Sequence, residues 1–138
     1  DQFDADIISK GENAVKDKIS EIEKQGNDAS QKDKELLTIL EIAYEMYKRG
    51  FKFYNVDIYK SDAVKFLIRD DGLLPPLNSL QGLGVNAAKN IARAREDGEY
   101  ISIEDLRTRA KVSKTVVEIL KNHGCLKGMP ETNQLTLF

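Results

Sequence analysis

The feature that most limits the fold of this chain is a pair of glycines, Gly82 and Gly84, directly before an alanine-rich, basic stretch. Glycine adopts positive φ angles without steric cost, so such a pair is typical of a tight turn. A helix that begins at this turn presents unpaired backbone N–H groups and a partial positive charge. Because glycine has no side chain, a phosphate can approach these amides closely. The pair therefore predicts an anion-binding turn.

The residues around this turn resemble a helix-hairpin-helix motif, in which leucine, proline, glycine, an apolar residue and glycine precede a helix with an early alanine. The matching residues are Leu80, Gly82, Leu83, Gly84, Ala88 and Ile91, whereas Gln81 replaces the usual proline. The resemblance implies that amides at the hairpin bind the phosphates of duplex DNA without reading its sequence. The expected DNA contacts here are Gly82, Leu83, Gly84, Asn86, Ala87, Lys89 and Arg93, with Arg95 near the same edge. The alternative is a glycine turn between two packed helices.

A second pair of helical segments follows at once, joined by the residues "KVSK". This connection lacks glycine, so it forms at best a degenerate second hairpin. Lys111, Ser113 and Lys114 place two cations and a capping hydroxyl where a second phosphate would bind. A helix pair that only supports the first hairpin explains the same residues equally well.

Serine at helix starts and glycine at helix ends mark five helices. Ser9 and Glu12 form a predicted capping box, and Ser30 opens a helix whose apolar residues cover more than one face. We expect that helix to be largely buried. The five helices are predicted at residues 9–26, 30–50, 86–97, 102–110 and 113–124.

The residue pattern changes from helical to strand-like between the second and third predicted helices. Residues 51–59 alternate aromatic or β-branched residues with polar ones, and "KFLIRDDGLL" indicates a strand that ends in a turn. Residues 3–7 give a weaker strand signal. We expect a mainly α fold with a small β element, comprising a tandem helix-hairpin-helix-like module and a flexible C-terminal tail. The predicted divisions are a helical segment at 1–50, a β element at 51–72, the helix-hairpin-helix module at 73–128 and the tail at 129–138.

The charge of the chain is unevenly distributed, which limits the possible partners. Residues 1–50 carry 8 basic and 12 acidic side chains, whereas residues 82–127 carry 9 basic and 6 acidic ones. A polyanionic partner should therefore contact the second half only. The alternative is that the difference is ordinary variation of surface charge. Cys125 is the single cysteine, which fits a reducing cytoplasm, and no apolar run is long enough to make a membrane a partner.

The last five residues are "QLTLF", which would expose large apolar groups. They resemble the pentapeptide that binds the bacterial sliding clamp: glutamine, leucine, a small polar residue, leucine and phenylalanine. The resemblance implies that the glutamine hydrogen-bonds at one subsite and that the final leucine and phenylalanine fill an apolar pocket. The expected clamp contacts are Gln134, Leu135, Thr136, Leu137 and Phe138. The alternative is a tail that folds back on the core.

Taken in this order, the motifs give the chain a resemblance to the C-terminal part of PolC-type DNA polymerase III alpha subunits of low-GC Gram-positive bacteria. The segments that carry the resemblance are "GNDAS", "RGFKFYNVDIYKSDA", "LPPLNSLQGLG", "KVSKT", "HGCL" and "NQLTLF". It implies that residues 1–50 border the fingers, that about 51–128 bind the duplex behind the active site, and that the tail binds the clamp. The partners would be double-stranded DNA, the sliding clamp and the remainder of the polymerase.

No residue of this chain is a candidate for catalysis. The metal-binding aspartates of the resembling polymerases lie in a palm that is absent here, so a Mg²⁺ requirement would belong to the parent protein. His123 and Cys125 are too few to form a zinc site, and core packing explains them better. We therefore predict a non-catalytic region that binds the DNA backbone and tethers a polymerase to its clamp. The alternatives are the docking domain of a DNA repair nuclease and a helical domain that binds only proteins.

Overall fold

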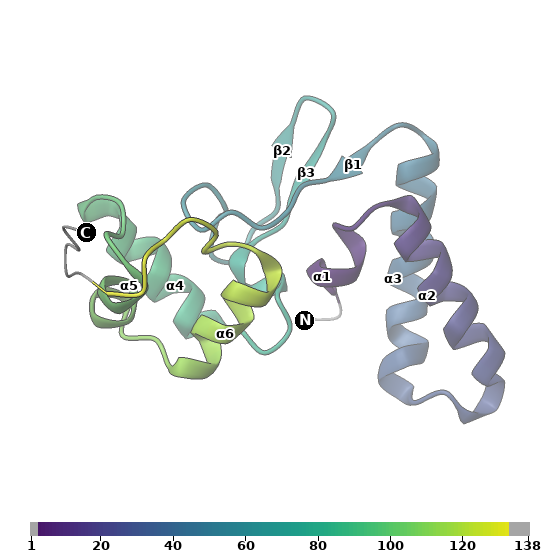
Figure 1. The fold of residues 1–138 in the computed structure, drawn as a ribbon. Coiled ribbons are helices and arrows are strands. Elements are labelled where there is room, and N and C mark those ends of the chain that lie inside the picture. Colours follow the sequence, from purple (N-terminus) through teal and green to yellow (C-terminus); the bar gives the residue numbers. More distant parts are fainter. Residues whose placement is uncertain (1–2, 133–138) are drawn as a thin grey trace.

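The computed structural model describes residues 3–132, which form two helical lobes with a small sheet between them (Figure 1). Each lobe has its own apolar core. The N-terminal lobe contains α1, α2 and α3, and the C-terminal lobe contains α4, α5 and α6. Phe3 packs against both cores and so joins the two lobes. The predicted mainly α fold with a small β element is confirmed.

The N-terminal lobe begins with α1 (Ala5–Ile8) where the sequence favoured a strand. The Asp4 side chain accepts hydrogen bonds from the amides of Asp6 and Ile7, so a local cap overrides the alternating pattern. The predicted capping box is also wrong. The next helix, α2 (Glu12–Gln25), follows Gly11 without a side-chain cap, and the Ser9 hydroxyl instead donates to the carbonyl of Tyr54.

The long helix α3 (Gln31–Lys48) pairs with α2 as a helical hairpin (Figure 1). Ser30 caps it, as predicted, by accepting from the amide of Asp33 at 3.1 Å. Its burial is less complete than predicted, because α2 covers only one side. Leu36 and Leu40 lie in the core, whereas the side chain of Ile42 is 59% exposed.

The sheet has the strand order β1 (Lys52–Phe53), β3 (Gly72–Leu74) and β2 (Leu67–Arg69). β1 runs parallel to β3, and β2 and β3 form an antiparallel hairpin in which Arg69 pairs with Gly72. A Cβ atom at Gly72 would lie 2.0 Å from the carbonyl oxygen of Lys52, so the strands can meet only at a glycine. Only two residues of the predicted segment 51–59 form a strand, and Gly72 lies inside a strand and not in the turn.

The C-terminal lobe begins after Pro75 and Pro76 with a single 3₁₀ turn at Leu77–Ser79. The helices that follow agree with the predicted positions to within a few residues. They are α4 (Val85–Ala94), which continues as a 3₁₀ turn at Arg95–Asp97, α5 (Ile103–Ala110) and α6 (Lys114–His123). As predicted, Ser102 and Ser113 cap α5 and α6 through their hydroxyls, which accept from the amides of Asp105 and Val116.

Residues 129–132 belong to the C-terminal lobe and not to a free tail, which corrects the predicted boundary. The carbonyls of Pro130 and Glu131 accept hydrogen bonds from the amides of Ile103 and Glu104, at 2.8 and 3.0 Å. The predicted clamp residues 134–138 lie outside the described residues. Within residues 3–132, no helix is both long and apolar enough to span a membrane.

Candidate nucleic-acid interface

The first hairpin, residues 82–84, enters α4 through a sharp turn. Gly82 has φ 89°, which favours glycine, and Leu83 points into the core with 3% of its surface exposed. Gly84 is the N-cap residue of α4, with φ −73° and ψ 168°. The buried Leu83 side chain anchors the turn. Only Gly82 adopts a positive φ, however, so the two glycines have different roles.

Gly84 leaves the start of α4 open. A Cβ atom added there would meet no atom within 4 Å, and Gly84 forms no side-chain cap. Among residues 3–132, none accepts a hydrogen bond from the amides of Val85, Asn86 or Ala87. These three amide donors lie at the partially positive end of α4 and have no acceptor there. This is the arrangement that binds a phosphate oxygen.

The second hairpin, residues 111–113, shares with the first a positive φ at its first residue and the angles of the helix N-cap, without a glycine. Lys111 is left-handed, with φ 54° and ψ 43°, and Val112 is buried with 7% exposed. Ser113 then has φ −76° and ψ 165°, close to the values at Gly84. The hairpin that looks degenerate in sequence is therefore complete in conformation. Its difference is chemical, because the Ser113 hydroxyl accepts from the amide of Val116 at 3.2 Å.

Exposed cations surround both hairpins. Lys89 and Arg93 lie on α4, Lys111 lies in the second hairpin, and Lys114 begins α6. Over the described range 3–132, no acidic residue forms an ion pair with any of these four. Four exposed cations without an acidic partner, on α4, in the second hairpin and at the start of α6, favour a polyanion as the ligand.

Each hairpin has contacts with the helix that follows the other hairpin. Arg93 and Lys111 line one pocket of about 320 Å³, together with Asp97. On the other side, a Cβ atom at Gly82 would lie 3.0 Å from the Ile119 side chain of α6. Of the predicted site residues, Arg93 of α4 and Lys111 of the second hairpin are therefore brought together.

A helix-hairpin-helix motif model matches residues 50–135, which is more than half of the chain. The chain belongs to the helix-hairpin-helix family. Along all 138 residues it is also 64% identical to the "DNA polymerase III PolC-type" of Clostridium perfringens, 61% identical to that of Caldanaerobacter subterraneus and 52% identical to that of Bacillus subtilis. The chain spans about 10% of the length of these relatives. The predicted resemblance to PolC-type polymerases is confirmed.

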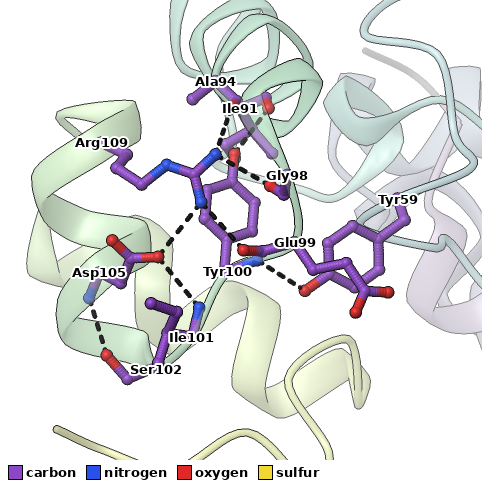
Figure 2. A network of polar contacts seen from close by, with 10 residues as sticks. All are labelled: Tyr59, Ile91, Ala94, Gly98, Glu99, Tyr100, Ile101, Ser102, Asp105 and Arg109. Carbon is purple, nitrogen blue, oxygen red and sulfur yellow. Dashed lines mark hydrogen bonds and ion pairs between the residues drawn. The ribbon is translucent and has the colours of Figure 1, made fainter. Parts of the chain in front are cut away.

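The two helix-hairpin-helix units are held together by Arg109, which the sequence analysis missed (Figure 2). Its guanidinium donates to the carbonyls of Ala94, Gly98 and Glu99 at 2.6, 2.9 and 3.1 Å. It also pairs with the Asp105 carboxylate at 3.2 Å. The i, i+4 spacing of Asp105 and Arg109 was the available sequence signal. Because these contacts bridge the end of α4 and the body of α5, Arg109 fixes one unit relative to the other.

Tyr100 completes this junction beneath the guanidinium, whose carbon lies 4.7 Å from the centre of the ring. The Tyr100 hydroxyl donates to the carbonyl of Ile91 at 2.8 Å, and its amide donates to the Tyr59 hydroxyl at 3.1 Å (Figure 2). Burial raises the pKa of Tyr100 to about 12, so the hydroxyl remains a donor at neutral pH.

Arg95, expected near the DNA-binding edge, has a structural contact instead. Its guanidinium donates to the carbonyl of Ile58 at 2.9 Å, which ties the loop after β1 to the end of α4. Among the other predicted residues on α4, Lys89 and Arg93 are exposed. Asn86 is exposed in the first turn, and Ala87 is partly buried beside it.

His123 connects the lobes through Asp6, and Cys125 packs within the C-terminal lobe. Because the backbone N–H of Val56 donates to His123 Nε2 at 3.0 Å, the proton of the imidazole lies on Nδ1, which is 2.6 Å from the Asp6 carboxylate. The Cys125 thiol donates to the carbonyl of Val56, and burial raises its pKa to about 12. Over residues 3–132, no group of three or more potential metal ligands is found.

Proposed function

We propose that this chain is a non-catalytic part of a replicative DNA polymerase that binds the backbone of duplex DNA without reading its sequence. The observation that carries the proposal is the pair of hairpins with matching N-cap angles, each leading into a helix and each followed by exposed cations. Backbone amides and lysine or arginine side chains contact phosphates, which are the same at every base pair.

The first hairpin contributes most of the contact made by backbone amides. Three amides at the start of α4 have no acceptor among the described residues, and the surface at Gly84 is open. A phosphate oxygen placed there would accept charge-assisted hydrogen bonds, which are stronger than bonds between neutral groups. Lys89 and Arg93 would then neutralise neighbouring phosphates along the same strand.

The identity of the parent protein extends the proposal. The relatives that match the whole chain are PolC-type DNA polymerases III, and this chain spans a tenth of their length. We expect polymerisation, with its Mg²⁺, to belong to the rest of such a protein and to take place in the cytoplasm. The chain would hold the duplex while the remainder of the polymerase performs the chemistry.

The terminal "QLTLF" would tether the polymerase to a sliding clamp. Five residues bury too little surface for a strong interface, so this contact alone should be about micromolar. Because the same chain would also bind duplex DNA, each weak contact raises the effective concentration of the other. The two together would keep the polymerase on DNA that carries a clamp.

Fluorescence anisotropy with labelled duplexes of two unrelated sequences tests the DNA-binding proposal. We expect equal affinity for both and a steep fall in affinity as salt rises. The variant K89E/R93E should bind much more weakly than K16E/K24E, a control with the same change in net charge on exposed residues of α2. Equal loss in both variants, or no binding at low salt, would contradict the proposal.

A further inference from the structure

Residues 3–8, which we name the joining segment, lie between the two lobes and contain α1 (Figure 1). Ala5 is fully buried in the core of the C-terminal lobe, whereas Ile8 is fully buried in the core of the N-terminal lobe. The Phe3 ring packs against the rings of Phe53 and Phe66, with centroid distances of 5.5 and 4.9 Å. The joining segment therefore contributes to both cores at once.

Each helix-hairpin-helix unit contributes a polar contact to this segment. The Gln81 side chain, directly before the first hairpin, donates from Nε2 to the carbonyl of Phe3 at 3.0 Å. His123, at the end of the helix that follows the second hairpin, has Nδ1 2.6 Å from the Asp6 carboxylate. These contacts join residues 78 and 117 positions apart in the chain. They fix the joining segment relative to the two hairpin units.

The contact from Gln81 depends on a departure from the helix-hairpin-helix motif. Gln81 stands where the motif usually has proline, and a proline has no side-chain donor for the bond to Phe3. Gln81 also lines a hollow of about 260 Å³ together with Gly82 and Gly84, the glycines of the first hairpin. A phosphate bound at the start of α4 would therefore lie beside the side chain that holds the joining segment.

We propose that Gln81 is a positioning residue that couples the first hairpin to the N-terminal lobe. This inference rests on the proposed DNA binding by that hairpin. The joining segment has two states, with the bond from Gln81 to Phe3 formed or broken. A phosphate at the hairpin fixes residues 81–84 in the conformation from which Gln81 reaches Phe3, so it favours the bonded state. The N-terminal lobe is then held most firmly when the duplex is in place.

Two substitutions of Gln81 remove the bond in different ways. Gln81→Met keeps the length of the side chain without its donor, and Gln81→Pro restores the residue usual in the motif. The backbone accepts proline, because Leu80 has φ −76° and ψ 126°, the extended conformation that precedes a proline. Gln31→Met is the matched control, since the Gln31 side chain is bonded to Glu35 on the exposed surface of α3.

The measurement is NMR of the ¹³C- and ¹⁵N-labelled full chain with and without a short DNA duplex. In the unaltered chain, the duplex should shift the Phe3 carbonyl and Asp4 amide signals, less than those at the start of α4. It should also slow hydrogen exchange at the Ile8 and Ser9 amides, which bond within the joining segment. In both Gln81 variants these two amides should exchange about fivefold faster, the usual worth of one neutral hydrogen bond, and should no longer respond to the duplex.

The position of the signals that respond separates the coupling from the DNA binding. If the start of α4 responds to the duplex while Phe3 and Asp4 stay unchanged, the coupling is overturned and the proposed DNA binding stands. A normal Asp4 response in either Gln81 variant would also overturn the role of Gln81. If the start of α4 does not respond at all, the DNA-binding proposal fails, and the coupling fails with it. Gln31→Met should behave as the unaltered chain does.

Discussion

The two hairpins of this chain have nearly the same backbone and different chemistry. Gly84 and Ser113 differ by only a few degrees in φ and ψ, yet one leaves the next helix open and the other caps it with a hydroxyl. The first hairpin can therefore bind a phosphate through backbone amides alone. The second depends more on its side chains, Lys111 and Lys114. The comparison teaches that conformation and ligand-binding capacity are separate properties of a hairpin.

The largest effect is expected from Gly82→Val, which tests whether the first hairpin needs its left-handed residue. A β-branched residue at φ 89°, close to Ile119, should lower the free energy of unfolding by about 2 kcal/mol and weaken duplex binding. Gly50→Val is the control, because Gly50 has φ 90° with open space around it in the other lobe. Thermal unfolding and anisotropy should show lost stability in both variants but lost DNA affinity only in the first.

A smaller loss is expected when the two hairpins are no longer held together. Arg109→Lys keeps the charge but cannot reach three carbonyls and Asp105 at once, so unfolding should become easier by about 1–2 kcal/mol. Duplex affinity should fall as well, because the hairpins lose their fixed spacing. Arg107→Lys, at an exposed position on the same helix, should change neither quantity. Denaturant unfolding and anisotropy give both results, and equal behaviour of the two variants would disprove the role of Arg109.

Exchanging the N-cap residues of α4 and α6 tests whether the cap determines how strongly each hairpin binds phosphate. Gly84→Ser introduces a hydroxyl that can accept from the Ala87 amide, as Ser113 does at Val116. We expect equal or slightly higher stability and about fivefold weaker duplex binding, since about 1 kcal/mol of phosphate bonding is lost. The reverse variant, Ser113→Gly, should lose a few tenths of a kcal/mol in stability without losing affinity. Anisotropy that shows no effect of Gly84→Ser would mean that the α4 amides do not bind phosphate.

The smallest effect is expected from Lys111→Asn. Asparagine tolerates the left-handed conformation at this position, so the hairpin should survive while one cation is removed. If Lys111 contacts one phosphate, the slope of log affinity against log salt should become shallower by about 0.9. Lys127→Asn removes an exposed cation beyond the end of α6 and should leave the slope unchanged. Identical slopes for the two variants would leave the second hairpin without a phosphate contact.

Much of the C-terminal lobe could be predicted from the sequence, because its signals are local. The capping serines and the buried Leu83 lie close to the residues they act on. The sheet could not be placed, because β1 pairs with a strand twenty residues away at a glycine contact. Residues 129–132 were assigned to the tail, since an irregular segment that satisfies a distant helix start has no periodicity to reveal it.

The candidate nucleic-acid interface could also be predicted only in part, because only its local signals are visible in the sequence. The glycine spacing pointed directly to the first hairpin. The second lacked the expected glycine, and nothing in the sequence indicated that Lys111 would adopt the left-handed conformation. Arg95 and Arg109 are both arginines near the predicted site, but their carbonyl partners lie ten or more residues away in the sequence, so their structural roles appear only in the fold.

The most direct test of the central claim is a titration of the ¹⁵N-labelled chain with a short DNA duplex, followed by amide chemical shifts. The account predicts the largest changes at Gly84, Val85, Asn86 and Ala87, smaller ones at residues 111–114, and little change at Ile103 and Glu104, whose amides are already bound. Changes that concentrate in the N-terminal lobe, or that affect the start of α5 as strongly as the start of α4, would contradict the claim that the open hairpin binds the DNA backbone.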